Sequence, residues 1–227
     1  MKKNNLKYKK FLMQKYLYDN KLKKVKHNLD DAYKNIDKLW YDQLDIENIR
    51  YSYISGDILS TFSKYDKKLN ILDIGCGYGV FPNYLSKFKN ISAYGIDTSK
   101  YAINLGKKKY KFKNLNYGDI SKLDINFDIK FDVATVIGVF WFMLDDFKSC
   151  YKNLRKILKK NGKVYFQVNI PRDNNIFKKK IKDYSDLYGF LNKFFIIDNF
   201  MSYEQKICIN KKLKTNQDSC IIKCKLR

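Results

Sequence analysis

The stretch Ile71 to Gly79, ILDIGCGYG, is an apolar run followed by glycines at every second position. A glycine-rich turn directly behind a strand lets the backbone approach a ligand closely. Asp97 ends the next apolar run, 22 residues after Gly75. A carboxylate at such a strand end can accept hydrogen bonds from both hydroxyls of a ribose. The glycines and the acid together indicate a nucleoside site, although Asp97 could instead cap the helix that follows it.

The spacing of the glycines departs from the pattern of a dinucleotide site. Such a site uses G-x-G-x-x-G, in which the third glycine lets the helix pack beside a pyrophosphate. Gly75 and Gly77 fit this pattern, but Val80 occupies the third position. The glycine comes one residue early, at Gly79. The turn alone is therefore weak support for a pyrophosphate.

Strand and helix signals alternate around these residues. We expect strands at 70–74, 91–97, 114–119, 131–140, 163–170, 194–200 and 219–227. We expect helices at 80–89, 100–110, 145–160 and 183–190, with Gly162 as the stop of the third one. This alternation predicts an α/β fold, in which helices cover a mainly parallel sheet and ligands bind at the carboxyl ends of the strands. The first 60 residues have few strand signals, so we expect a helical extension or lid at 1–60 and the main domain at 61–227.

The motifs resemble those of class I S-adenosylmethionine-dependent methyltransferases. LDIGCGYG is similar to their D-x-G-x-G-x-G motif, GDI at 118–120 to their adenine-binding stretch, and FDVATVI and LKKNGKVYFQV to their fourth and fifth strands. The resemblance extends from Tyr51 to the C-terminus and implies a Rossmann-like, seven-stranded, mostly parallel sheet with an antiparallel last hairpin. It also implies S-adenosylmethionine as cofactor and S-adenosylhomocysteine as product. The residues that it assigns to the cofactor are Asp73, Gly75, Cys76, Gly77, Gly79, Asp97, Thr98, Asp119, Ile120 and Ile137.

A finer resemblance lies upstream, in WYDQLDIENIRYSYI. This segment is similar to the one that precedes the glycine motif in the ubiquinone-pathway O-methyltransferase group. The resemblance implies that Arg50 meets the cofactor's carboxylate, which suits the planar guanidinium fork. The alternative is an arginine on a solvated helix face. Many members of this group carry a Glu-His pair after the fourth strand, where this chain has Trp141 and Phe142.

The residues that would meet the methyl acceptor are less clear. Methyl transfer from a sulfonium needs alignment and a dry site rather than a covalent nucleophile. His27 and Tyr51 are weak candidates for a general base. We expect Phe140, Trp141 and Tyr41 to line the acceptor pocket, although the run FWFM could equally be core.

Composition limits the cofactors and the compartment. Five cysteines without a CxxC pair and a single histidine predict no metal site. The N-terminus lacks the apolar core of a signal peptide, and no run has membrane-spanning length, so we expect a cytoplasmic protein. The net charge is +23, but only four of the 46 basic residues are arginines. Because nucleic-acid surfaces favour arginine, most of this charge indicates a solvated surface.

Three functions stay open. The first is methylation of a small, anionic metabolite, such as a phosphorylated compound or sugar derivative, most simply on oxygen. The second is methylation of an RNA ribose hydroxyl or ring nitrogen, with nucleic acid as partner. The third is a non-catalytic subunit that binds the cofactor. The two prolines, Pro82 and Pro171, exclude the N/D-P-P-Y/F and Pro-Cys motifs of amine and cytosine-carbon nucleic-acid methyltransferases.

Overall fold

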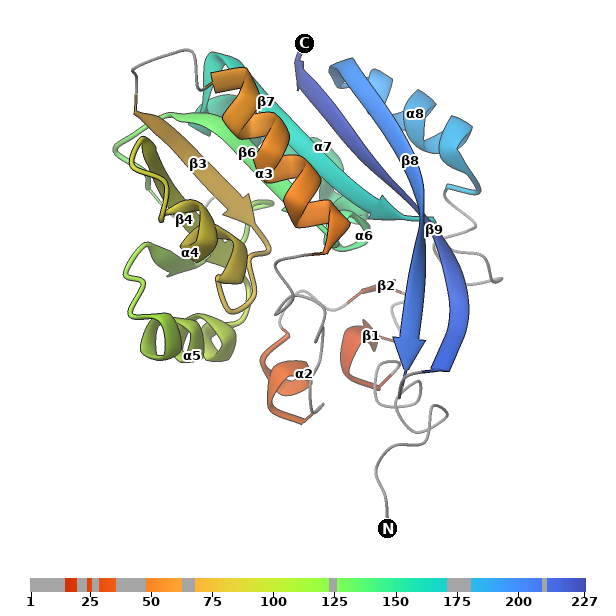
Figure 1. Ribbon diagram of the computed structural model, residues 1–227, viewed down its shortest axis with the longest axis horizontal. Helices are drawn as coiled ribbons and strands as arrows, with labels where there is room; N and C mark the ends of the chain where they lie inside the picture. Colours follow the sequence, from red (N-terminus) through yellow and green to blue (C-terminus); the bar gives the residue numbers. More distant parts are fainter. Residues whose placement is uncertain are drawn as a thin grey trace.

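The computed structural model describes residues 15–19, 24–25, 29–35, 48–62, 68–122, 126–170, 181–209 and 212–227. Their main feature is a seven-stranded sheet with the order β5-β4-β3-β6-β7-β9-β8 (Figure 1). The strands are β3 (Leu69–Ile74), β4 (Ile91–Asp97), β5 (Leu115–Tyr117), β6 (Phe131–Ile137), β7 (Leu158–Asn169), β8 (Phe195–Ile209) and β9 (Lys212–Leu226). β3 to β7 are parallel, and β9 runs antiparallel between β7 and β8. The predicted fold, with its antiparallel last hairpin, is confirmed.

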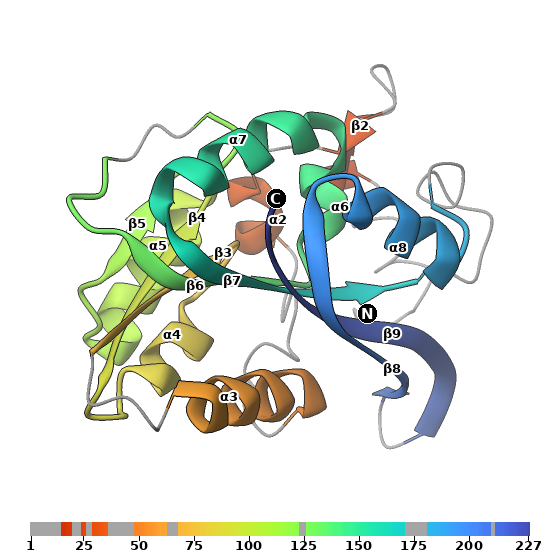
Figure 2. The ribbon, with the colours of Figure 1, turned by 90° about the horizontal axis from the view of Figure 1, so that it is seen from above.

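Helices cover both faces of this sheet (Figure 2). α3 (Ile49–Phe62) and α4 (Val80–Leu85) lie on one face, and α7 (Phe147–Ile157) and α8 (Tyr184–Asn192) lie on the other. The alternation of β6 explains the two faces: Val133 and Ile137 pack with α3 and α4, whereas Ala134 and Val136 pack with α7 and α8. α5 (Lys100–Tyr110) packs beside β4 and β5.

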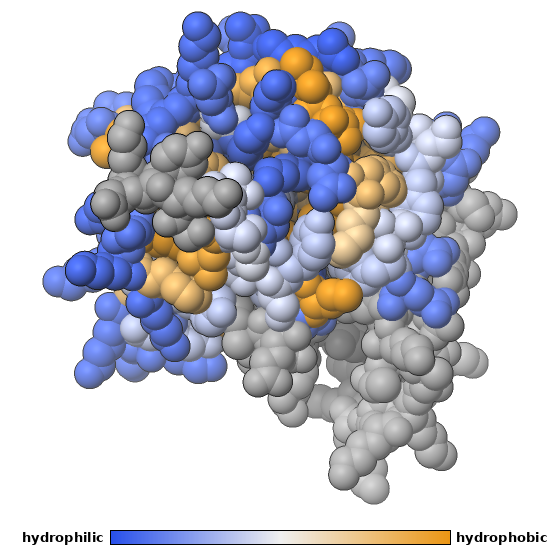
Figure 3. All heavy atoms as spheres, turned by 45° about the horizontal axis from the view of Figure 1, so that its top comes forward, coloured by the Kyte–Doolittle hydropathy of each residue, from blue (hydrophilic) through white to orange (hydrophobic). Residues whose placement is uncertain are grey.

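The described N-terminal elements are short. β1 (Tyr18–Asp19) and β2 (Lys24–Val25) form a small antiparallel pair, and α2 (Asp30–Asn35) packs on α5. None of the helices in the described ranges is both long and apolar enough to cross a membrane. Figure 3 shows hydrophilic residues over most of the visible face, with smaller apolar areas between them.

Several predicted elements have other bounds in the structure; for example, the helix expected at 80–89 ends at Leu85. The helix expected at 145–160 ends at Ile157, and Gly162 lies inside β7 instead of ending a helix. The cause is that Leu158 already has extended backbone angles and pairs with Phe131 of β6. The strand expected at 131–140 ends at Ile137, because residues 140–143 form the short helix α6 (Phe140–Met143), which the 3-10 turn Leu144–Asp146 joins to α7.

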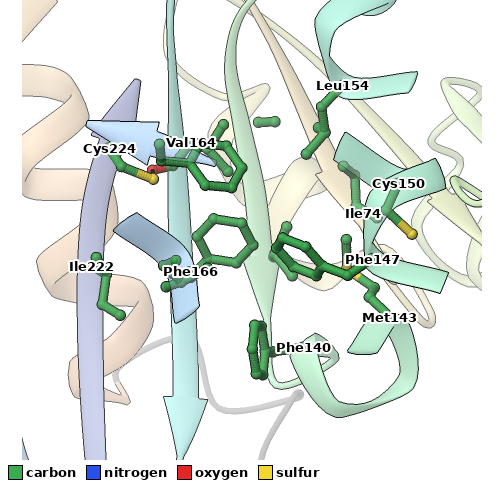
Figure 4. Packing of buried hydrophobic residues seen from close by; sticks show 14 of the residues in the cluster. Ile74, Phe140, Met143, Phe147, Cys150, Leu154, Val164, Phe166, Ile222 and Cys224 are labelled. Atoms are coloured by element: carbon green, nitrogen blue, oxygen red, sulfur yellow. Dashed lines mark hydrogen bonds between the residues drawn. The ribbon is translucent and has the colours of Figure 1, made fainter. Parts of the chain in front are cut away.

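The larger part of the core lies between the sheet and α7 and α8. Figure 4 shows some of its side chains; those that are labelled come from β3, β7, β9, α6 and α7 and include Phe140, Phe147 and Phe166. These rings meet mostly edge to face, for example Phe140 and Phe166 with centroids 6.1 Å apart and planes at 87°. The core thereby fixes the carboxyl ends of β6 and β7, where ligands of such sheets bind.

Candidate functional site

The glycine turn between β3 and α4 has an unusual backbone. Gly75, Gly77 and Gly79 all have positive φ, at 72°, 54° and 75°. At Gly75 a side chain is also excluded by space, since a Cβ would lie 2.5 Å from Cγ1 of Val139. The turn therefore requires glycine for conformation and for close approach to the segment after β6.

Asp97, at the end of β4, holds this turn. Its Oδ2 accepts a hydrogen bond from the Gly77 N–H at 2.8 Å, and its Oδ1 accepts one from the Ser99 N–H at 2.8 Å. A carboxylate has about four acceptor sites, so both oxygens keep capacity for a ligand's hydroxyls. Burial raises the pKa of Asp97 to about 6, although the two backbone hydrogen bonds lower it. Asp97 is thus both a support of the turn and an acceptor at the cavity.

Asp73 is the second acidic residue near this turn, and it lies on β3, two residues before Gly75. It is buried in β3, and its Oδ1 accepts a hydrogen bond from Thr135 Oγ1 of β6 at 2.7 Å. Burial raises the pKa of Asp73 to about 7; the Thr135 hydrogen bond lowers it, the nearby Asp97 charge raises it and Arg50 lowers it. Asp73 does not line the cavity that the turn borders. It ties β3 to β6 beneath the turn.

A cavity opens at the carboxyl ends of β3, β4 and β6. The space in and in front of it, open solvent included, is about 670 Å³. The predicted residues that line it are Gly75, Asp97, Thr98, Asp119 and Ile120. These come from three separate loops, which the parallel strands bring to one edge.

The N-terminal segment closes one side of this cavity. Leu29, directly before α2, and Tyr33, within α2, line it, and both are buried. Asp30 fastens α2 to α5, because its Oδ1 accepts from Ser99 Oγ at 2.6 Å and from the Tyr101 N–H at 2.9 Å. Tyr33 packs edge to face on Tyr78 of the glycine turn, with ring centroids 5.1 Å apart.

Arg50 lies on the first turn of α3, close to Gly138 of the cavity lining. Its exposed fraction is 4%, so it is no solvated surface arginine. Its guanidinium carbon lies 4.8 Å from the ring centroid of Tyr51, and Nη1 lies 4.0 Å from where a Gly138 Cβ would be. Gly138 itself lines the cavity. Tyr51, the weak base candidate, is buried and stacks on Phe81, with ring centroids 5.0 Å apart.

The structure separates the two aromatic residues that we expected in the acceptor pocket. Phe140 has no exposed surface and lies inside the core beside Phe166 (Figure 4), which corrects its assignment to the pocket. Trp141 is half-buried, and its Nε1 donates a hydrogen bond to the Asn169 carbonyl at 3.0 Å, at the end of β7. The next two residues, Phe142 and Met143, line the cavity instead.

Other predicted residues lie apart from the cavity. The Cys76 side chain packs with Ile103 and Leu115, and Ile137 packs toward α3, although the neighbouring Gly138 lines the cavity. The Gly77 and Gly79 backbones shape the turn without lining the cavity. His27 and Tyr41 lie outside the described residues.

Sequence reasoning missed the residues that close the cavity. Leu29 precedes and Tyr33 lies in a short helix without a motif, so no sequence signal marked them. Val139, Phe142 and Met143 follow β6, and the apolar run at this point was their only signal. In the described ranges, no group of three or more His, Cys, Asp or Glu side chains could hold a metal ion.

Comparison with known proteins connects this geometry to a family. Residues 72–166 match a family model described as a methyltransferase domain. A ubiquinone biosynthesis O-methyltransferase of Pelagibacter ubique is 34% identical over 122 residues, which cover 50% of each chain. A tRNA U34 carboxymethyltransferase of Campylobacter jejuni subsp. doylei is 30% identical over 131 residues, which cover 55% of this chain and 43% of that protein. The chain thus spans about half the length of these curated relatives.

The fold matches solved methyltransferases over a larger range. The N-methyltransferase NodS of Bradyrhizobium japonicum, solved in complex with S-adenosylhomocysteine, aligns with a TM-score of 0.57 and 16% identity, over 86% of this chain and 95% of NodS. At this identity the likeness concerns the fold. Residues 72–166 thus match a methyltransferase domain, and they lie in a fold like that of solved methyltransferases.

Proposed function

We propose that this protein transfers the methyl group of S-adenosylmethionine to an oxygen of a small, anionic metabolite. The observation that carries the proposal is the cavity at the strand ends, which joins Asp97 and Thr98 on one side to Gly75 and Gly138 on the other. The position of Asp97 favours a ribose as ligand. The positive φ values of the glycine turn favour a ligand that lies against the backbone. These residues suit the nucleoside and the amino-acid tail of S-adenosylmethionine.

Each group has a definite task in this proposal. Asp97 would accept the ribose hydroxyls, and Asp119, Ile120 and Ser121 would border the adenine. Arg50 would hold the carboxylate of the amino-acid tail, because a guanidinium fork suits a carboxylate and Arg50 lies close to Gly138 of the cavity lining. The cofactor supplies a methyl group on a positively charged sulfur, which leaves readily. The protein's part is then to align the acceptor and exclude water.

Two features support a small, anionic acceptor. Leu29 and Tyr33 close one side of the cavity, which suits a compact molecule better than a polymer. Three exposed lysines, Lys34, Lys100 and Lys122, each stand within two residues of a side chain that lines it. Their positive charge would raise the local concentration of an anion.

Binding and transfer assays test the proposal. Calorimetry should give micromolar affinity for S-adenosylhomocysteine, and labelled S-adenosylmethionine should transfer methyl to members of a panel of phosphorylated metabolites and sugar acids. Arg50→Met should weaken S-adenosylhomocysteine at least tenfold but leave 5′-methylthioadenosine, which lacks the amino-acid tail, unchanged. If both ligands lost affinity equally, Arg50 would not bind the carboxylate. If the wild-type protein did not bind S-adenosylhomocysteine, the whole proposal would be wrong.

RNA methylation is the second candidate, and the net charge of +23 favours it. It predicts tight RNA binding that falls steeply as salt rises, because phosphate contacts release counterions. Weak RNA binding, or methyl transfer to metabolites alone, would exclude it. A subunit that binds the cofactor without catalysis predicts S-adenosylhomocysteine binding and no transfer to either class.

A further inference from the structure

A buried amide lies at the carboxyl end of β7, outside the cavity lining. Gln167 has no exposed surface, and its side chain is on the face that α3 covers, as is that of Tyr165 two residues earlier. Strand neighbours on this face are apolar near Gln167, for example Ile137 on β6 and Ile221 on β9. A fully buried amide in such a place needs partners for both of its ends.

The nitrogen end of this amide has its partners. Nε2 of Gln167 donates to Asn169 Oδ1 at 2.6 Å and to Tyr203 Oη at 3.2 Å. Ser219 Oγ also donates to Asn169 Oδ1, at 2.8 Å. Both amide hydrogens are thus used within this polar cluster. The carbonyl oxygen, Oε1, has no hydrogen-bond partner among the residues that the structure describes.

This oxygen lies close to Gly138, a residue that lines the cavity, although Gln167 itself is not in the lining. Gln167 pairs with Ile137, and the N–H of Gly138 donates to the Gln167 carbonyl at 3.1 Å. A Cβ on Gly138 would lie 3.8 Å from Gln167 Oε1 and 4.0 Å from Arg50 Nη1. An acceptor and a cationic donor therefore flank the same point beside a glycine that lines the cavity.

We propose that Gln167 Oε1 binds the α-ammonium group of S-adenosylmethionine beside the carboxylate on Arg50. The inference rests on the proposed function, in which Arg50 holds that carboxylate. An α-amino acid carries its ammonium and its carboxylate on one carbon atom. A carbonyl oxygen and a guanidinium around one point match that pair in charge and in spacing.

The same geometry distinguishes the ammonium from the methyl acceptor as the partner of Gln167. The methyl group is on the sulfur, which two further carbons separate from the α-carbon. A group that shares its position with Arg50 lies at the amino-acid end rather than at the sulfur. Gln167 is then a cofactor-binding residue that selects for the amine, held in place by Asn169 and Tyr203.

Calorimetry with two ligands tests this assignment. One ligand is S-adenosylhomocysteine, and the other is its deamino analogue, in which hydrogen replaces the amine. The wild-type protein should bind the deamino analogue at least tenfold more weakly. In Gln167→Met, which keeps the length of the side chain but lacks the acceptor, this ratio should fall close to one. Tyr165→Phe is the matched control on the same strand face, and it should keep the wild-type ratio.

The outcomes separate the inference from the proposed function. A wild-type protein that binds neither ligand defeats the proposed function. If the wild type binds both ligands equally, or if Gln167→Met keeps the wild-type ratio, only the inference is overturned. A fall of the ratio in Tyr165→Phe would also overturn it, because the effect would not be specific to the amide. If Gln167→Met does not fold, the wild-type ratio alone still decides between support and rejection.

Discussion

Lowering the pH should weaken cofactor binding through Asp97. Its pKa is raised to about 6 because the carboxyl group is buried, and the hydrogen bonds from the Ser99 and Gly77 N–H groups only partly offset burial. A ribose hydroxyl donates best to an ionised carboxylate. When Asp97 is protonated, one of its oxygens carries a hydrogen. That oxygen then accepts hydrogen bonds from the backbone N–H groups and from a ribose less well. The affinity for S-adenosylhomocysteine should therefore decrease as the pH falls below about 6.

The size of this effect follows from the pKa. With a pKa of about 6, nearly all copies of Asp97 are ionised at pH 7.5, but only about one in eleven is ionised at pH 5. If the protonated form binds poorly, the dissociation constant should rise about tenfold, equivalent to ~1.4 kcal/mol. The ligand's amine titrates above this range, and its carboxyl group and adenine titrate below it.

The same pKa shift affects stability with a definite sign. The pKa of Asp97 is raised from its usual value of 3.8, so the folded state holds the proton more tightly than the unfolded state. Its contribution is fully present below pH 3.8 and is lost as the pH rises through about 6. Asp73 acts in the same direction up to about pH 7. Without ligand, the free energy of unfolding should thus fall between pH 4 and pH 7, by about 3 kcal/mol for Asp97 alone.

The assay is calorimetry at constant ionic strength in half-unit steps from pH 5 to 7.5, with circular dichroism to confirm folding at each step. Asp97→Asn should bind weakly and show little further change with pH. Asp73→Asn should still lose affinity for S-adenosylhomocysteine as the pH falls below about 6, because Asp73 does not line the cavity. The reasoning would be refuted if the dissociation constant of the folded wild type did not change with pH. It would also be refuted if Asp97→Asn lost affinity at low pH as the wild type does.

Three further substitutions test the turn, the core and the closing helix. Gly75→Ala should lower the free energy of unfolding by about 1–3 kcal/mol and weaken S-adenosylhomocysteine, because it combines positive φ with a 2.5 Å contact to Val139; thermal unfolding and calorimetry measure both. Phe140→Ala should lower the free energy of unfolding in urea by about 3–5 kcal/mol, because Phe140 is fully buried. The folded variant should keep its affinity for S-adenosylhomocysteine. A loss of affinity without a loss of stability would mean that Phe140 does line the pocket. Asp30→Ala removes the bonds to Ser99 and Tyr101, so stopped-flow should show several-fold faster release of S-adenosylhomocysteine; an unchanged rate would mean that α2 does not retain the ligand.

Local patterns were sufficient for the sheet and the glycine turn. Strands such as β3 and β4 are marked by runs of apolar residues, and their observed ends lie close to the predicted ones. The turn could be predicted because its positive φ values need glycine, which the sequence displays directly. Asp97 and Asp119 could be placed at one edge because parallel strands share a carboxyl end.

The end of the third predicted helix shows where local patterns fail. Gly162 is a typical helix stop, yet the chain leaves the helix at Ile157, because Leu158 pairs with Phe131. Sheet pairing between residues far apart in sequence overrides the local signal. Phe140 is a similar case, since its run FWFM suits a pocket and a core equally well. Only the rings around it in the folded chain decide that it is core.

The sequence by itself indicated a mostly parallel sheet, the glycine turn after β3 and an acidic residue at the end of β4. Only the tertiary structure brought Leu29 and Tyr33 onto the cavity and Gln167 beside Arg50. Gln167 and Arg50 are 117 positions apart, and no local pattern in the sequence pairs them. Backbone conformation leaves its mark in the residue types, whereas contacts between distant side chains arise only when the whole chain packs.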